Sequence, residues 1–153
     1  MSSVHSLQRI QVLNISLDEA WNFFSSPKNL QRITPAYMKF KVINNTLSDT
    51  MYEGQIIEYS VRPLLGIPLY WMTEITHVKD KVFFIDEQRF GPYSFWHHQH
   101  HFKETDQGVE MTDLLHYKMP FYGLGRIVNK LVVDRQVNKI FDYRYKKVAE
   151  MFV

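Results

Sequence analysis

Residues 108–153 read GVEMTDLLHYKMPFYGLGRIVNKLVVDRQVNKIFDYRYKKVAEMFV, and the hydrophobic period of this stretch changes near Pro120. Up to Met119 the segment is rich in β-branched and aromatic residues, which is typical of a strand. Beyond the glycines at 123 and 125, apolar residues recur at helical spacing on one broad face. That face consists of Val133, Val137, Ile140, Phe141, Val148 and Met151. The change of period predicts a strand followed by one long helix near residues 124–150.

Upstream of this stretch, the chain from residue 37 onward reads as a series of strands. Six segments, the last of which is the one just described, are rich in β-branched and aromatic residues. They are YMKFKVINN (37–45), GQIIEYSVR (54–62), PLYWMTEITHV (68–78), KVFFIDEQR (81–89), YSFWHHQHHFKE (93–104) and GVEMTDLLHYKM (108–119). Because short turn-forming sequences separate them, the pattern predicts antiparallel hairpins and not βαβ units.

The N-terminal part supplies the remaining elements. Residues 4–13 alternate loosely and predict a first strand. Ser16 and Glu19 stand three residues apart, which is the signature of a capping box at the start of a short helix. Pro27 favours the first turn of a second short helix, and Pro35 ends it. The predicted fold class is therefore α+β: a curved antiparallel sheet of about seven strands against a long C-terminal helix, with two short helices after the first strand. A sheet that bends away from such a helix leaves a cavity between them.

Length and composition narrow the function further. A chain of 153 residues fits one domain, 1–153, and 15% of its residues are aromatic, so that aromatic rings fill the core or line a cavity. The formal charge of +2 is too small for a nucleic-acid-binding protein. The sequence has no cysteine, no secretory signal and no apolar run long enough to span a membrane, so we expect a cytoplasmic protein.

Four segments of the chain resemble a known superfamily. They are ISLDEAWNFFSSPKNLQRITP (15–35), DEQRFGPYSFWHHQHHF (86–102), MTDLLHYKMP (111–120) and VDRQVNKIFDYR (133–144). They resemble a bacterial subgroup of the START/SRPBCC superfamily, which includes the birch-pollen-allergen relatives and polyketide cyclase/dehydrase-related proteins. The resemblance implies the helix-grip fold. Because the superfamily includes lipid carriers, cyclases, hydroxylase components and hormone receptors, the resemblance does not imply a single function.

Four of the seven histidines lie between residues 97 and 101. Residues two apart on a strand share a face. One face therefore carries Trp96, His98, His100 and Phe102, and the other carries Phe95, His97, Gln99 and His101. The even-numbered positions are those that recur in the subgroup, so the resemblance implies that this set faces the cavity.

Asp113 on the next predicted strand is the best partner for the inward histidines. Three interpretations of His98 and His100 remain open. The imidazoles are satisfied by Asp113, Tyr117 or backbone carbonyls, or they read a polar group of a ligand, or they bind a metal with Asp113 as third ligand. Only two good metal ligands and one third candidate are present, so the pattern favours the first interpretation and assigns no metal site. His116 has the opposite parity to Asp113 and points the other way.

Other charged residues are expected at the surface. Glu58 and Glu87 lie on predicted strands, where charged side chains usually face solvent. Arg144 and Arg135 on the long helix are expected to pair with nearby aspartates, which are Asp134 and Asp142, or with the sheet edge.

The segment RPLLGIPLYW (62–71) combines apolar side chains with glycine and proline. Leu64, Leu65 and Ile67 at its tip either gate the cavity or pack on the helix. We expect the tip from Leu64 to Pro68 to be more mobile than the sheet and to border the cavity mouth.

These observations favour a protein that binds a small, mainly apolar molecule, aromatic or lipid-like, and is not an enzyme. The expected binding residues are Phe23, Trp71, Phe84, Trp96 and Phe102 as apolar wall, Tyr59 and Tyr117 as amphipathic wall, and His98, His100 and Asp113 at a polar end. No catalytic residue and no cofactor is assigned. Two alternatives are a cyclase or dehydratase that uses a His–Asp pair for proton transfer, and a module that binds a protein partner through residues 62–71.

Overall fold

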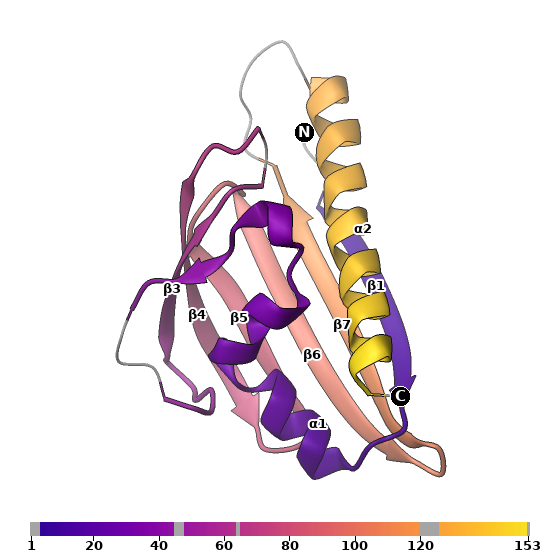
Figure 1. Cartoon of the computed structure of the whole chain (residues 1–153). Coiled ribbons are helices and arrows are strands. Elements are labelled where there is room, and N and C mark those ends of the chain that lie inside the picture. The colour runs from indigo at the N-terminus through magenta and orange to yellow at the C-terminus, as the bar shows by residue number, and fades with distance from the viewer. Residues whose placement is uncertain (1–3, 45–47, 64, 120–125, 153) are drawn as a thin grey trace.

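A computed structural model describes residues 4–44, 48–63, 65–119 and 126–152, with the side chains of 126–130 left aside. The elements, in order, are β1 (His5–Leu13), α1 (Leu17–Phe24), the 3-10 helices η1 (Pro27–Ile33) and η2 (Ala36–Met38), β2 (Lys41–Val42), β3 (Ile56–Val61), β4 (Leu69–Lys79), β5 (Phe83–Phe90), β6 (Phe95–Thr105), β7 (Gly108–Lys118) and α2 (Arg126–Met151). Figure 1 shows α2 lying along the sheet near β1 and β7, and α1 lying in front of the sheet at the bottom of the view.

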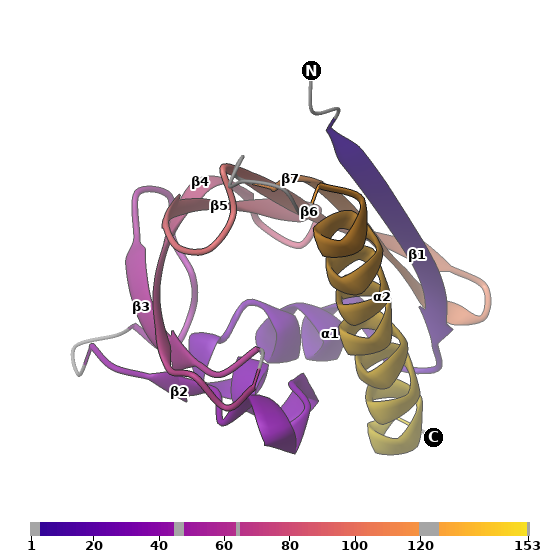
Figure 2. The ribbon, with the colours of Figure 1, turned by 90° about the horizontal axis from the view of Figure 1, so that it is seen from above.

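The seven strands form one antiparallel sheet in the order β1-β7-β6-β5-β4-β3-β2. Seen from above, the sheet curls around its concave side, where α1, the 3-10 helices and α2 lie (Figure 2). This is the predicted helix-grip α+β fold. None of the helices within the described residues combines the length and the apolar character that a membrane-spanning helix needs.

The long helix buries the predicted face. Val133, Val137, Phe141 and Val148 are all buried. Helical spacing therefore selects the residues that meet the sheet, as the period of 3.6 predicts. The described helix begins at Arg126, and the expected first positions 124 and 125 lie outside the described residues.

The short helices differ in part from expectation. Ser16 caps α1 by accepting a hydrogen bond from the Glu19 backbone N–H at 3.2 Å. The second helix, η1, begins at Pro27 as expected but is a 3-10 helix. The predicted strand 37–45 was too long, because η2 occupies Ala36–Met38 and the strand β2 comprises Lys41–Val42. Lys39 has a left-handed backbone (φ 43°), which separates these two pieces.

Two clusters form the core. In the larger one, Trp21 of α1 packs edge-on against Phe84 and Phe102, with ring centroids 5.9 Å and 5.5 Å away. The smaller one joins β1 and β7 to α2 and consists of Leu7, Leu115, Tyr117, Val133, Val137 and Phe141. The core therefore fastens α1 to the middle of the sheet and α2 to its β1–β7 side.

Candidate functional site

A cavity of about 150 Å³ lies between the concave face of the sheet, α2 and the short helices. Seven of the ten residues expected at the site line it: Phe23, Tyr59, Trp71, Phe84, Trp96, His98 and His100. Its wall also includes Val61, Ile75 and Phe141. Most of the wall is apolar. Asp86, His98 and His100 contact one another in it, and single polar side chains of other elements, such as Ser26, Asn29 and Gln136, also line it.

The other three expected residues lie outside the described wall. Phe102 packs in the core, and its ring centroid lies 5.5 Å from that of Trp21. Tyr117 donates its hydroxyl to Asp134 at 2.6 Å and packs in the smaller cluster. Asp113 lies behind the histidines, facing a small second pocket beside α2.

The histidines of β6 divide between the two faces of the sheet. His98 and His100 are both 4% exposed and line the cavity. On the opposite face, the Nδ1 atom of His97 lies 2.6 Å from Glu87, and His101 contacts Gln99. Strand alternation thus accounts for the two sets, and Glu87 and Glu58 contact partners on the outer face, as expected.

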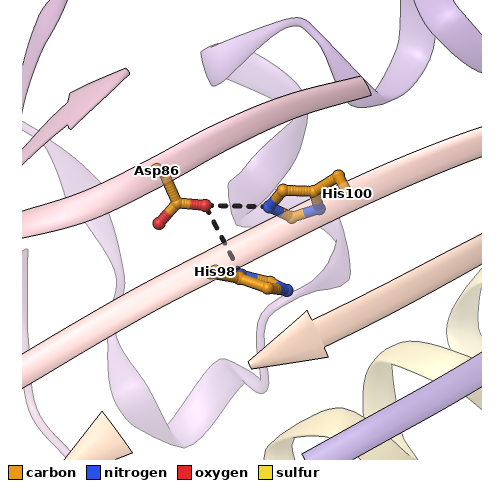
Figure 3. Close-up of side chains that lie close together, drawn as sticks. All are labelled: Asp86, His98 and His100. Atoms are coloured by element: carbon orange, nitrogen blue, oxygen red, sulfur yellow. Dashed lines mark hydrogen bonds and ion pairs between the residues drawn. The ribbon is translucent and has the colours of Figure 1, made fainter. Parts of the chain in front are cut away.

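Two carboxylates flank the inward imidazoles (Figure 3 draws one of them). The Nε2 atom of His98 donates to Asp113 Oδ1 at 2.9 Å, and its Nδ1 lies 3.4 Å from Asp86 Oδ2. The Nε2 atom of His100 donates to Asp86 Oδ2 at 2.8 Å, and its Nδ1 lies 3.1 Å from Asp113 Oδ1. Each imidazole therefore has one nitrogen toward Asp86 and the other toward Asp113.

Sequence reasoning missed Asp86, although its position contained a signal. Asp86 stands two residues after Phe84, so the two share a face of β5. In the sheet, Phe84 is paired with His100 and Asp86 with His98. The Phe84 ring stacks on the His100 imidazole, with centroids 4.2 Å apart. The carboxylate is therefore held directly beside both histidines.

The expectation for Arg144 was wrong. It was expected to pair with neighbouring aspartates of its helix or with the sheet edge, but its Nη1 lies 3.8 Å from Asp113 Oδ1 on β7, which lies inside the sheet between β1 and β6. Asp142 instead pairs with Arg9 of β1 at 2.9 Å. The rotation of α2 points Arg144 into the cavity wall, and its Nε is buried with no hydrogen-bond partner among the described residues. Arg135 is exposed.

The positive groups of the cluster keep its two buried carboxyl groups ionised. Burial raises the pKa of Asp113, but Arg144 and the two imidazoles outweigh burial and hold that pKa well below its usual value. Burial raises the pKa of Asp86 as well, and His98 and His100 outweigh it, so the net shift is downward. Both carboxyl groups are therefore ionised near neutral pH.

The two histidines shift in opposite directions. Burial and the neighbouring His100 lower the pKa of His98, which favours its neutral form. Burial also lowers the pKa of His100, but its contacts with Asp113 and Asp86 outweigh burial and raise it. With His100 protonated, two positive charges, on His100 and Arg144, face two negative ones. The cluster then offers imidazole and guanidinium donors beside carboxylate acceptors at the cavity wall.

The segment 62–71 reaches the cavity at its two ends, through Pro63 and Trp71. Pro63 lines the cavity wall, and its carbonyl oxygen accepts a hydrogen bond from the Gln136 side chain of α2. Leu65 is 92% exposed and Ile67 is 55% exposed, so neither packs on the helix. Leu64 lies outside the described residues. The mobility of the tip stays a prediction.

Comparisons with known proteins agree with the fold. No family model and no curated protein matches the chain. Among solved structures, protein CV1439 from Chromobacterium violaceum matches with a TM-score of 0.72 at 11% identity, over 96% of each chain. The ginseng major latex-like protein 151 from Panax ginseng matches with a TM-score of 0.68 at 10% identity, over 98% of each chain. Ara h 8.0201 matches with a TM-score of 0.60 at 11% identity, over 95% of this chain and 98% of its own.

These matches cover nearly the whole chain, at identities that report on the fold alone. The chain has the helix-grip fold, which is the fold that the resemblance of its sequence to the START/SRPBCC superfamily implies.

Proposed function

We propose that this protein binds a small, mainly apolar molecule in the cavity between the sheet and α2. The observation that carries the proposal is the cavity itself, whose wall is mostly apolar and contains one group of imidazole and charged side chains, His98, His100, Asp86 and Arg144. Concave, mostly apolar sites with a few convergent polar groups are the usual form of small-molecule sites. The solved structures with this fold show that the scaffold is shared, and they do not identify a ligand.

The volume of the cavity limits the ligand. A cavity of about 150 Å³ lined by apolar side chains holds a molecule the size of benzene. One aromatic ring or a short alkyl chain with one polar group therefore fits the described space. A ligand of about ten heavy atoms that gains about 0.5 kcal/mol per atom binds with a Kd of roughly 0.1–1 mM. A larger ligand requires the cavity wall to move.

Two tryptophans make binding directly measurable. Trp71 and Trp96 line the cavity and lie 5.0 Å apart between ring centroids, whereas Trp21 is in the core. We expect 1-octanol, which does not absorb at the wavelengths of tryptophan, to change the emission of the protein in a saturable way. The hydroxyl of the probe meets the polar cluster and its chain meets the apolar wall.

A matched pair of variants on β3 tests where the probe binds. Val61 is buried and lines the cavity, whereas Ser60 lies on the other face of the same strand. Val61→Phe is expected to weaken octanol binding at least about tenfold, because the ring occupies the cavity. Ser60→Phe adds the same ring outside and is expected to leave the affinity unchanged. Equal affinities in the wild type and both variants would remove the cavity as the binding site.

Native mass spectrometry identifies the natural ligand. Because a ligand with a Kd of roughly 0.1–1 mM is lost during purification, the protein is first mixed with a concentrated small-molecule extract of cells, and it is then expected to carry an additional small mass that Val61→Phe lacks. This mass belongs to the molecule whose polar end contacts the histidine cluster.

A second candidate function follows from the two His–Asp hydrogen bonds at the wall. A buried imidazole held by a carboxylate is able to transfer a proton to a bound molecule, as a cyclase or dehydratase requires. If this occurs, the protein exchanges a carbon-bound hydrogen of its ligand for deuterium in D₂O. His98→Gln abolishes the exchange while the ligand still binds. A ligand that keeps all its hydrogens in the presence of wild-type protein excludes this candidate.

A further inference from the structure

We propose that Asp86, His98 and His100 form a binding site for a divalent transition-metal ion of the zinc type. The three side chains come from two neighbouring strands and line the same side of the cavity (Figure 3). One potential ligand atom from each lies within 4.8 Å of the other two. The proposal goes beyond small-molecule binding and does not rest on it.

The spacing of the ligand atoms fits a zinc ion. With bonds of about 2.0–2.1 Å, two ligands of a tetrahedral zinc ion lie about 3.3 Å apart. His98 Nδ1 and Asp86 Oδ2 are 3.4 Å apart, and His100 Nε2 and Asp86 Oδ2 are 2.8 Å apart. The first distance already matches, and the second has to open by about half an ångström. Two imidazoles and one carboxylate are also ligand types that zinc prefers.

The ring nitrogens that point away from Asp86 also fit a metal site. Metal-bound histidines almost always donate their second ring N–H to a carboxylate, a backbone carbonyl or a water molecule, which orients the ring. Here His98 Nε2 lies 2.9 Å, and His100 Nδ1 3.1 Å, from the same oxygen of Asp113. Asp113 is in turn 3.8 Å from Arg144. The nitrogens opposite these, one on each ring, both face Asp86.

In this arrangement, Asp86, His98 and His100 are the metal ligands, and Asp113 orients the two imidazoles from the side away from Asp86. Asp86, His98 and His100 line the cavity, whereas Asp113 does not. An ion held by the three would therefore keep its remaining coordination positions toward the cavity. With both imidazoles neutral, a divalent ion, two carboxylates and Arg144 sum to one positive charge. The site then favours a ligand that brings an anionic oxygen, such as a carboxylate.

The test begins with full-length protein that carries no affinity tag and has been freed of metal by a chelator. It is titrated with Zn²⁺ by calorimetry and with Co²⁺ by visible absorption, since Co²⁺ reports its own coordination. We expect one ion per chain, with absorption typical of four or five nitrogen and oxygen ligands. Absence of stoichiometric binding by the wild type overturns the proposal, whatever the variants do.

Variants on the two faces of β6 and on its neighbours locate the ion. Asp113→Asn is expected to weaken Zn²⁺ binding about 10–100-fold, and Asp86→Asn and His98→Gln by more than that. His97→Gln and His101→Gln remove histidines from the opposite face and are expected to bind as the wild type does. Circular dichroism confirms that each variant is folded before it is titrated.

The reverse result contradicts the proposal. If His97→Gln or His101→Gln loses the ion while Asp86→Asn keeps it, the ion sits on the outer face. The octanol titration is run separately on metal-free protein. A chain that binds octanol and no ion therefore contradicts this proposal alone, and a chain that binds the ion and no octanol contradicts only the proposed function.

Discussion

Arg144 is the cation that faces the central carboxylate from the helix, and replacing it tests the balance of the cluster. Its Nη1 lies 3.8 Å from Asp113 Oδ1, and both side chains are largely buried. At that distance, an effective dielectric constant of about 20 gives about 4 kcal/mol of attraction. Removing one partner of a buried pair typically costs 3–5 kcal/mol, because the remaining charge stays buried.

We expect Arg144→Met to lower the free energy of unfolding by about 3 kcal/mol, near the lower end of that range, because Asp113 keeps its contacts with His98 and His100. Methionine and arginine have similar helix propensities, so the helix itself is not weakened. Urea denaturation of metal-free protein measures the change. For a chain of this size, it corresponds to a fall of roughly 6–12 °C in Tm.

Arg135→Met is the matched control. It makes the same substitution on the exposed side of α2 and is expected to change the free energy of unfolding by less than about 0.5 kcal/mol. If Arg144→Met and Arg135→Met are equally mild, Arg144 does not stabilise the buried carboxylate and the electrostatic account of the cluster is wrong.

Three further predictions concern the frame around the site. Phe84 is 2% exposed and stacks on His100, so Phe84→Ala is expected to lower the free energy of unfolding by about 3–5 kcal/mol in urea denaturation. Phe90 is 67% exposed, and Phe90→Ala is expected to lower it by less than about 0.5 kcal/mol. Similar values for both variants would contradict the packing. Ser16→Ala removes the cap of α1 and should cost about 1 kcal/mol, with Ser16→Asp close to the wild type. Hydrogen exchange measured by mass spectrometry should be faster at residues 65–68 than in β6, and equal protection would argue against a mobile tip.

The fold was predictable because its signals are local. The change of period near Pro120 separates β7 from α2, and the capping box at Ser16 marks α1. The short strand β2 was less predictable, since Met38 and Phe40 alternate like strand residues, yet the left-handed Lys39 interrupts the segment. A single backbone conformation of that kind leaves little trace in composition.

The site was predictable only in part, since it depends on relations between elements. Parity within β6 places His98 and His100 on one face, because that relation needs a single strand. Asp86 was missed because its place beside His98 depends on how β5 and β6 are paired. Arg144 was misjudged because its direction depends on the rotation of α2 against the sheet, which helical periodicity alone specifies only to within a broad face.

The central claim is that a small apolar molecule binds between the sheet and α2, and a crystal soaked with 4-bromophenol tests it most directly. The bromine is located by its anomalous scattering, independently of how the rest of the ligand is interpreted. The account predicts one strong peak among Trp71, Ile75 and Phe84, with the phenol hydroxyl toward His98 and His100. Bromine found only at outer-face residues such as Phe90, or no bound bromine at a saturating concentration, would contradict it.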